Sequence, residues 1–299
     1  TGSVPEPFTI AQGVLALPAG HCMTIGDGQR PSPRCWYRLA DKFSSDVASL
    51  GRLSRAELAE ALIDSGRAHM VADIPVGLFL SAGIDSTLLL GLQRQLGFDN
   101  VSTITAQFRE FSGSDADESY LAAHTAAHFG SQHTTRLIDR DEFEADRENF
   151  FAAMDQPTID GVNIWFVAKA AREQGLKACL SGLGADELFG GYSSFVDVPS
   201  WNRRMGILGQ GAWREMAART LSRTLPAGLL HAKAYALLGQ ATDLAGSWLV
   251  RRGLFTPWDI ERLLGRDRAR AAWAELDLSA QRADAIAAGP DSDFGRIMV

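Results

Sequence analysis

The sequence predicts an α/β protein built on a parallel sheet with helices on both faces, preceded by a short N-terminal β segment and followed by a helical C-terminal region. Two observations favour this fold class. Between residues 76 and 180, short apolar runs alternate with segments of helical spacing, and strands that alternate with helices form right-handed βαβ units. The first run, residues 76–80, is continuously apolar, as is typical of a strand buried on both faces.

The N-terminal residues 1–38 predict a β-hairpin or a pair of strands. They are rich in Gly and Pro, and short apolar runs lie at 14–17, 23–25 and 35–37. The Gly-Asp-Gly sequence at 26–28 is typical of a turn between two strands.

The middle of the chain contains the elements of the predicted sheet. A helix begins at Ser54, which forms a capping box with Glu57, and ends before Pro75, because proline disfavours a helical conformation in the preceding residue. Strands are then predicted at 76–80, 101–108, 132–138 and 177–180, and helices at 86–96, 117–129, 140–153 and 162–174.

Helical spacing dominates the remainder of the chain, residues 196–299. Helices are predicted at 213–225, 229–238 and 243–252. Thr256 and Pro257 form an N-cap and first-turn pair that opens a further helix to Leu264, which Gly265 closes.

Composition places the chain among ordinary globular proteins. Its 299 residues, 46% hydrophobic and 22% charged, are enough for one large or two modest domains. The net charge of −7 argues against a general nucleic-acid binder. We therefore expect no nucleic acid as a partner. No apolar run approaches the roughly 18 residues that a membrane span needs, so we expect no membrane partner either.

The three cysteines, Cys22, Cys35 and Cys179, are odd in number and lack metal-binding spacing, which indicates a reducing compartment. Because no signal peptide precedes the body of the chain, we expect a cytoplasmic protein. The chain begins at Thr1 without Met and ends on apolar residues up to Val299, so we expect a fragment.

A small-residue loop, 81–86, follows the first predicted strand. Gly83 allows a tight turn, and Ser81 and Ser86 supply hydroxyls. The following helix would direct free N–H groups and its positive dipole end at an anion. Asp85 beside such an anion is unfavourable unless a cation bridges them, which indicates Mg²⁺. The loop matches neither G-x-x-x-x-G-K-[ST] nor G-x-G-x-x-G.

A second loop, 181–192, repeats this chemistry after the last predicted strand. It contains Ser181, Gly182 and, at a predicted helix start, Asp186. Ligands of parallel sheets lie at the carboxyl ends of the strands, so both loops are expected to share one crevice and to hold one Mg²⁺–triphosphate between them. Taken alone, the second loop could equally be a Gly-rich turn with a solvated Asp-Glu pair.

These stretches resemble a known family. The first loop resembles the S-G-G-x-D-S pyrophosphate loop of the N-type ATP pyrophosphatases, with Ala82 in place of the first glycine. Together, 73–86 and 181–192 resemble the paired signatures of the ATP-dependent domain of the asparagine synthetase family. Residues 122–134 resemble its helix-Gly-x-x-His segment, and 155–157 its Asp-Glu-Pro turn. The resemblance implies a sheet of the adenine nucleotide alpha-hydrolase (PP-loop) type.

The resemblance also implies a domain organisation. Residues 8–38 look like the closing strands of the family's N-terminal glutaminase domain. Residues 1–45 would then be the last strands of a mostly absent glutaminase domain, and residues 46–299 an ATP-dependent synthetase domain that is incomplete at its C-terminus. Neither Cys22 nor Cys35 matches the catalytic cysteine with which the glutaminase domain begins.

By the same resemblance, the ATP-binding residues come from both loops and two strands. The residues that would grip the pyrophosphate portion of ATP are Ser81, Gly83, Asp85 and Ser86, with Ala82 lining it. Phe79 and Ala106 match positions that flank the adenosine, and Ser181 and Gly182 match positions that touch the nucleotide from the second loop. Asp85 and Asp186 would hold Mg²⁺.

The implied reaction belongs to asparagine biosynthesis by a glutamine-hydrolysing ligase. The side-chain carboxylate of aspartate is joined to AMP, pyrophosphate leaves, and ammonia from glutamine displaces AMP. The expected substrates are small molecules: ATP, aspartate or another carboxylate, and ammonia from glutamine. A homodimer is one possible oligomeric state. Catalysis would come mostly from positioning and charge stabilisation.

The sequence departs from the family's pattern at Leu183, where many members have a glutamate proposed as a base. Leucine cannot move a proton, so the acceptor stays open and no catalytic residue is assigned. The family's Glu-x-Arg-x-Pro segment and active-site lysine are not found before Val299, and Lys169 and Lys177 are expected to be solvated. Two alternatives therefore remain: an amidotransferase for a different carboxylate, and a non-catalytic nucleotide-binding remnant.

Overall fold

The computed structural model describes residues 2–26, 28, 31–42, 54–209, 211–224, 232–277, 280–281, 284, 287 and 293–298. The chain divides into two compact units, one formed by Gly51–Asp186 and the other by Thr1–Leu50 with Glu187–Val299. The predicted domain boundary between residues 45 and 46 lies outside the described residues and stays a prediction.

The N-terminal segment contains one short antiparallel strand pair, β1 (His21–Cys22) and β2 (Arg34–Cys35), followed by α1 (Leu39–Lys42). The predicted pair of strands is confirmed, but the apolar runs at 14–17 and 23–25 are not strands. Val14 and Leu15 are exposed, so their run has no buried face that would favour a strand. Asp27 of the predicted turn lies outside the described residues.

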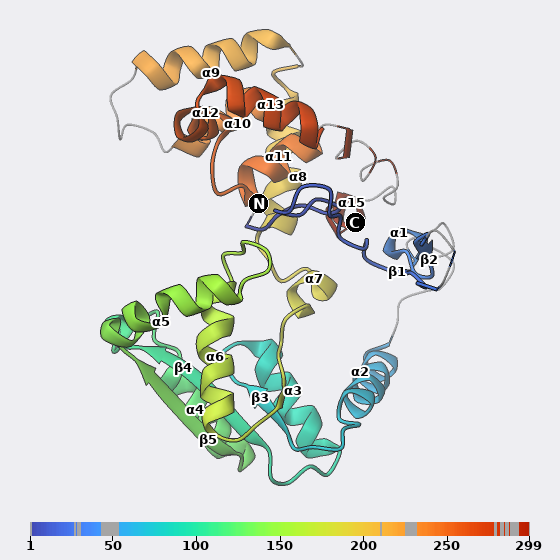
Figure 1. Ribbon diagram of the computed structural model, residues 1–299, viewed down its shortest axis with the longest axis vertical. Helices are drawn as coiled ribbons and strands as arrows, with labels where there is room; N and C mark the ends of the chain where they lie inside the picture. Colours follow the sequence, from blue (N-terminus) through green and yellow to red (C-terminus); the bar gives the residue numbers. More distant parts are fainter. Residues whose placement is uncertain are drawn as a thin grey trace. The chain divides into compact units, whose positions relative to one another are not determined.

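The unit Gly51–Asp186 is built on a four-stranded parallel sheet in the order β5–β4–β3–β6. Figure 1 shows β5, β4 and β3 of this sheet in the lower part of the view. The strands are β3 (Val76–Phe79), β4 (Ser102–Phe108), β5 (Gln132–Ile138) and β6 (Ala178–Leu180). Each strand lies within one residue of its predicted bounds.

The helices of this unit are α2 (Arg55–His69), α3 (Ile84–Gln95), α4 (Ser119–Phe129), α5 (Arg140–Ala153) and α6 (Gly161–Glu173). Ser54 caps α2 as predicted: its hydroxyl accepts from the N–H of Glu57 at 3.2 Å, and the Glu57 carboxylate accepts from the N–H of Ser54 at 2.7 Å. α2 ends at His69 with Met70 as its C-cap, so it is shorter than the predicted helix that ends before Pro75.

Helices cover both faces of the sheet, as predicted. One core cluster joins the sheet to α3 and α4 and contains Leu78, Leu80, Leu90, Val101, Ala122 and Ala126. The opposite face packs against α5 and α6 through two clusters, whose buried members are Ile104, Ala170 and Ala171 in the first, and Ile138, Phe150 and Phe166 in the second. Alternate residues of β3 therefore point to different helix layers, which is why the run at 76–80 is apolar throughout.

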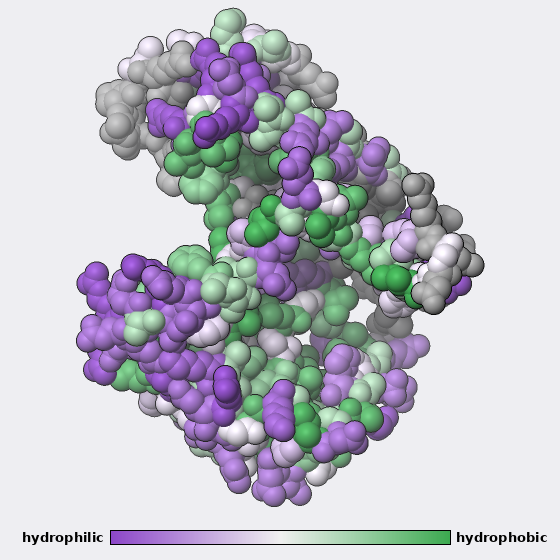
Figure 2. All heavy atoms as spheres, in the orientation of Figure 1, coloured by the Kyte–Doolittle hydropathy of each residue, from purple (hydrophilic) through white to green (hydrophobic). Residues whose placement is uncertain are grey.

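A network of ion pairs joins β5, α5 and α6. Arg136 binds the carboxylates of Glu142 and Glu173, and the Lys169 ammonium lies 2.7 Å from Glu142 and 2.6 Å from Asp146. Figure 2 shows the mostly hydrophilic surface over α5, toward the left of its lower part. The Lys169 side chain is 32% exposed, so it stays in contact with solvent as expected, but the packing of α6 against α5 also places two carboxylates beside it.

The unit that contains Glu187–Val299 is helical. Its helices are α8 (Ser194–Gly206), α9 (Ala212–Thr224), α10 (Ala232–Gln240), α11 (Leu244–Arg252), α12 (Pro257–Leu264), α13 (Arg266–Leu276) and α15 (Asp293–Met298). Thr256 caps α12, Pro257 opens it and Gly265 closes it, as predicted. The predicted helix ends at 225 and 229 lie outside the described residues. α8 contains Pro199 and has no counterpart among the individually predicted helices.

One fully buried arginine joins α9 to the end of α10. The guanidinium of Arg214 donates to the carbonyls of Leu238 at 2.9 Å, Gly209 at 3.0 Å and Ala241 at 3.0 Å. Its side chain has 0% relative exposure. The last carbonyls of a helix have no partner within the helix, so Arg214 satisfies groups that α10 leaves open.

In the part of the chain that the structure describes, every helix is too short or too polar to cross a bilayer.

Candidate functional site

The two predicted loops leave neighbouring strands of the sheet. β3 pairs with β4 on one side and with β6 on the other, with Val76 opposite Ala178 and Leu78 opposite Leu180. The chain runs outward from β3 through β4 to β5 and then returns to place β6 on the other side of β3. In open α/β sheets, such a reversal of strand order opens a crevice at the carboxyl ends of the strands, where ligands bind.

The two loops are in direct contact at Gly182. A Cβ atom added to Gly182 would lie 3.1 Å from the Cβ of Asp85 and 3.1 Å from the backbone nitrogen of Ser86. Only a residue without a side chain leaves this space free. The structure thus brings Asp85, Ser86 and Gly182 together, although they are far apart in the sequence.

The first loop is wound around two serine hydroxyls. The buried Ser86 Oγ accepts from the N–H of Ser81 at 3.1 Å and lies 3.0 Å from Ser81 Oγ. Ser81 Oγ in turn accepts from the N–H of Gly83 at 3.1 Å. The two serines therefore hold the loop in shape and use two of its backbone donors.

Gly83 has a different role from the predicted one. Its φ of −68° and ψ of 151° are ordinary extended values, so the tight turn does not require glycine. A Cβ at this position would approach Ser81 Oγ to 3.1 Å. Gly83 therefore supplies room beside the serine hydroxyl and not a special backbone conformation.

The N-terminus of α3 is suited to an anion. Its N-cap, Gly83, has no side chain that could accept from the first-turn N–H groups. Such groups have no partner within the helix, and together with the helix dipole they favour negative charge. The half-buried Asp85 lies in this first turn, where a carboxylate also stabilises the helix itself.

The second loop has a sharper turn. Gly184 has a φ of +97°, a conformation that favours glycine, and it precedes α7 (Ala185–Phe189). Ser181 Oγ accepts from the N–H of Leu183 at 3.3 Å. The Leu183 side chain is 75% exposed, while Asp186 is half-buried in α7.

The two predicted adenosine-flanking residues lie on the face of the sheet that α6 covers. Phe79 packs with the cluster around Ile104, its partner across β3 and β4. Ala106 follows Ile104 by two residues on β4, so it shares that face, and it packs against the cluster that contains Phe166 of α6. Both side chains are half-buried and also serve the core.

The carboxylates at the site fit a magnesium ion that is bound together with phosphate. Asp85 and Asp186 come from the first turn of α3 and from α7, on the two loops that touch at Gly182. Among the described residues, no group of three or more His, Cys, Asp or Glu side chains could hold a metal alone. Mg²⁺ takes oxygen ligands and usually needs only one or two protein carboxylates, with phosphate and water completing its shell.

Sequence reasoning missed one residue at this site, Glu118. Its carboxylate accepts from the N–H of Ala82 in the first loop at 3.4 Å. Glu118 precedes α4 at the end of the connection from β4, hence at the same edge of the sheet. The sequence did contain a signal for Glu118: it lies in the segment that follows a predicted strand, and residues that face a ligand commonly follow the ends of strands.

The resemblance to a helix-Gly-x-x-His segment leads to His133, which lies elsewhere. His133 is the second residue of β5, near the amino ends of the strands. Its Nδ1 lies 3.0 Å from Thr103 Oγ1 and its Nε2 lies 3.1 Å from Thr135 Oγ1. These contacts give it a structural role in the sheet.

Burial lowers the pKa of His133, which makes the stability of the fold sensitive to pH. The folded state binds the proton more weakly than the unfolded state, so this contribution is complete above the unfolded-state pKa of about 6.5 and is lost as pH falls below it. We expect His133→Gln to reduce the loss of unfolding free energy between pH 7.5 and pH 5. Urea unfolding at the two pH values measures this, and a wild-type pH dependence in the variant would contradict it.

His124→Gln is the matched control for this measurement. His124 is exposed on α4, so its removal should leave the pH dependence unchanged.

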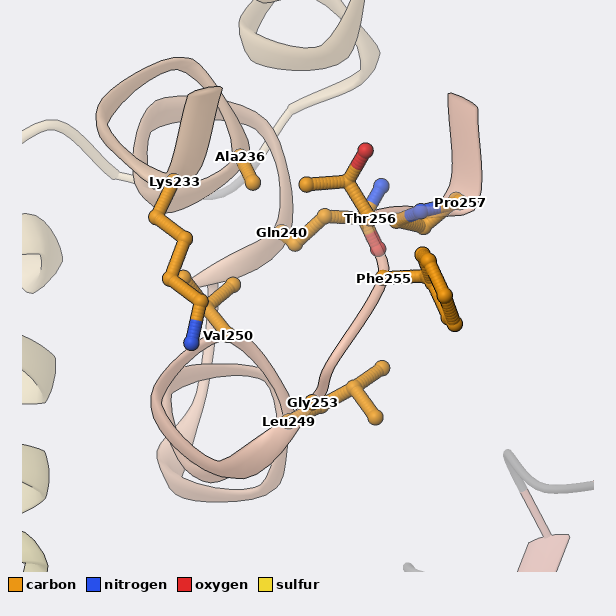
Figure 3. Close-up of a pocket in the computed structure, with 9 residues that line it drawn as sticks. All are labelled: Lys233, Ala236, Gln240, Leu249, Val250, Gly253, Phe255, Thr256 and Pro257. Atoms are coloured by element: carbon orange, nitrogen blue, oxygen red, sulfur yellow. The ribbon is translucent and has the colours of Figure 1, made fainter. Parts of the chain in front are cut away.

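The helical unit contains a small cavity (Figure 3). It lies between α10, α11 and the segment before α12, and Lys233 runs past Val250 to donate to the carbonyl of Arg251 at 3.2 Å. Its volume is about 10 Å³, which is about the size that one water molecule needs. It is too small for a substrate.

From the contact at Gly182, we expect that a side chain at this position weakens the binding of a polyphosphate. Gly182→Val would push the second loop away from Asp85 and Ser86, and overpacking of this kind costs about 1–3 kcal/mol. We expect the affinity for a bound polyphosphate to fall at least about tenfold. Isothermal titration with ATP and Mg²⁺ measures it. Gly66→Ala is the control, because the added Cβ would make only an ordinary 3.5 Å contact with Leu96; equal affinities in both variants would contradict the prediction.

Known proteins resemble this chain over about two thirds to three quarters of its length. The model of the asparagine synthase family matches residues 57–284. The chain is 34% identical over 229 residues to a protein of Mycobacterium tuberculosis (strain ATCC 25618 / H37Rv) named "Putative asparagine synthetase (glutamine-hydrolyzing)", covering 76% of this chain and 34% of the relative. It is 32% identical over 196 residues to "Asparagine synthetase (glutamine-hydrolyzing) 1" of Bacillus subtilis (strain 168), covering 64% of this chain and 29% of the relative.

A third relative has a different kind of name. The chain is 29% identical over 207 residues to "Amidase chry2" of Gibberella zeae, covering 64% of this chain and 30% of the relative. The chain thus spans about a third of the length of the curated relatives that it matches.

Proposed function

Because the chain belongs to the asparagine synthase family, we propose that it is the ATP-dependent part of a ligase that converts a carboxylate into an amide. The observation that supports this proposal most strongly is the contact of Gly182 with Asp85 and Ser86 at the point where the strand order reverses. Two small-residue loops that meet at this edge can enclose a polyphosphate.

In the proposed complex, the loop 81–86 and the N-terminus of α3 bind the pyrophosphate portion of ATP. Ser181 and Gly182 contact the nucleotide from the second loop, and Phe79 and Ala106 flank the adenosine. Asp85 and Asp186 hold Mg²⁺, which would neutralise phosphate charge and stabilise the leaving pyrophosphate.

The proposed reaction has two displacements. A carboxylate oxygen of the acceptor attacks the α-phosphorus of ATP, the bond to the β-phosphate oxygen breaks, and pyrophosphate leaves. Ammonia then attacks the acyl carbon, the bond to AMP breaks, and the nitrogen loses a proton to give the amide. The first step is needed because a free carboxylate is a poor electrophile. The loops contribute by positioning and by preorganised charge.

We propose aspartate as the acceptor and glutamine as the source of ammonia, as the names of the relatives suggest. Residues 1–45 would then be the last strands of a glutaminase domain. A different carboxylate is the second candidate. It is favoured by the exposed Leu183, which has no group that could transfer a proton, and by the relative named an amidase.

The test identifies the nucleotide products that the full-length gene product forms from Mg²⁺-ATP, ammonium and aspartate. Production of AMP and pyrophosphate that depends on aspartate would support asparagine formation. AMP formed without dependence on aspartate would favour another acceptor. ATP binding with no AMP would contradict the proposed ligase and favour a non-catalytic nucleotide-binding protein.

A further inference from the structure

The backbone donors of the first loop do not all have the same kind of partner. The N–H groups of Ser81 and Gly83 bind serine hydroxyls within the loop. The N–H of Ala82, between them, is bound from outside by the carboxylate of Glu118 at 3.4 Å. An anionic oxygen therefore already occupies a donor of the loop that is proposed to bind phosphate.

The backbone around Glu118 is held in place by its neighbour, Asp117. The Asp117 carboxylate accepts from the side chain of Gln107 at the end of β4 at 2.9 Å and from the N–H of Gly113 at 3.0 Å. It also accepts from the hydroxyl of Ser119 at 2.6 Å and from its N–H at 3.1 Å. The Ser119 hydroxyl, followed by these backbone donors, lowers the pKa of Asp117 to about 2. The connection from β4 to α4 thus has a fixed shape that presents Glu118 to the first loop.

We propose that Glu118 is a specificity residue that makes this site select metal-bound over metal-free polyphosphate. The inference rests on the proposed function, since it assigns Glu118 a role toward the same ATP. Its physical basis is the repulsion between the Glu118 carboxylate and the phosphates, which grows with the negative charge of the ligand.

The selectivity follows from the charges of the two ligand forms. Coulomb repulsion is proportional to the product of the charges, and metal-free ATP carries about four negative charges while Mg²⁺-ATP carries about two. The repulsive energy from Glu118 is therefore about twice as large for the metal-free form. Removing this charge should strengthen the binding of both forms, but metal-free ATP should gain more.

The experiment compares the dissociation constants of ATP measured with excess Mg²⁺ and with EDTA, by isothermal titration, in the wild type and in Glu118→Gln. If the substitution raises the affinity for Mg²⁺-ATP about tenfold, it should raise the affinity for metal-free ATP about a hundredfold, because the repulsive energy is twice as large. The ratio of the two dissociation constants, which is the preference for Mg²⁺-ATP, then falls about tenfold. Glutamine keeps the size of the side chain and removes only its charge. Glu118→Ala removes the charge and the hydrogen bond together, and it should lower the preference to a similar extent.

Glu110→Gln is the matched control. Glu110 is exposed in the same connection, and within the described residues it has no hydrogen bond to the loop. Its substitution should leave the preference within threefold of the wild type.

An unchanged preference in Glu118→Gln would overturn the inference, and so would a tenfold weakening of both ligand forms, which would make Glu118 an ordinary binding residue. The proposed function has a separate readout. If the wild type binds Mg²⁺-ATP but Glu118→Gln keeps the wild-type preference, only the inference fails. If the wild type binds no ATP under either condition, the proposed function fails and the inference fails with it.

Discussion

Replacing Asp85 or Asp186 by alanine is expected to abolish the binding of Mg²⁺-ATP, with a loss of affinity of at least about 100-fold, or about 3 kcal/mol. The two carboxylates lie on loops that touch at Gly182, and each would supply an oxygen to the same magnesium ion. A magnesium ion held by only two protein carboxylates needs both of them to stay bound. Without the ion, the negative charges of the phosphates are not neutralised. Titration calorimetry with ATP and Mg²⁺ measures the loss.

Two controls separate metal binding from other effects of these substitutions. Asp141→Ala removes an exposed carboxylate from the first turn of α5, and it should leave ATP affinity unchanged. Thermal unfolding of the Asp85 variant should show only the small loss expected for a first-turn carboxylate, about 0.3–1 kcal/mol. Unchanged ATP affinity in both variants, Asp85→Ala and Asp186→Ala, would rule out the shared magnesium ion.

Substituting Arg214 by leucine is expected to destabilise the helical unit by about 3 kcal/mol. The substitution removes the donors of the Leu238 and Ala241 carbonyls, and each unsatisfied buried group costs about 1–3 kcal/mol. The third carbonyl, that of Gly209, belongs to an exposed residue and can bind water instead. Removing the guanidinium also removes the free-energy cost of burying its charge. The net loss of stability is therefore expected near the lower end of the summed cost of the unsatisfied carbonyls. The free energy of unfolding in urea measures this effect.

The matched control is Arg268→Leu, the same substitution at an exposed position of α13. It should change the free energy of unfolding by no more than about 0.5 kcal/mol. Equal stability of the two variants would show that the carbonyl contacts of Arg214 contribute nothing to the fold. Arg214→Lys should recover only part of the loss, because an ammonium cannot reproduce the planar fork that reaches three carbonyls.

The elements of the sheet were largely predictable from the sequence. The apolar runs of β3 and β6 and the helical spacing of α5 and α6 each depend on residues close together in the chain. The capping boxes at Ser54 and Thr256 are also local, since each involves a residue only three positions further on. Burial periodicity and caps act through neighbouring residues, so the sequence alone determines them.

The role of Gly83 shows where local reasoning fails. The sequence predicts a turn that needs glycine, yet the backbone there is in an ordinary extended conformation. The space beside Ser81 Oγ is what excludes a side chain. This space exists only because Ser81 and Ser86 turn their hydroxyls toward each other inside the folded loop.

The sequence by itself determined the strands, most helices and the two small-residue loops. The tertiary structure decided the strand order β5–β4–β3–β6, the contact of Gly182 with Asp85, and the carboxylate of Glu118 on the N–H of Ala82. It also decided that Lys169 is paired and that Arg214 is buried. The physical reason is range: propensity, periodicity and capping act within a few residues, whereas these contacts join segments that become neighbours only when the strands take their order and the helices pack.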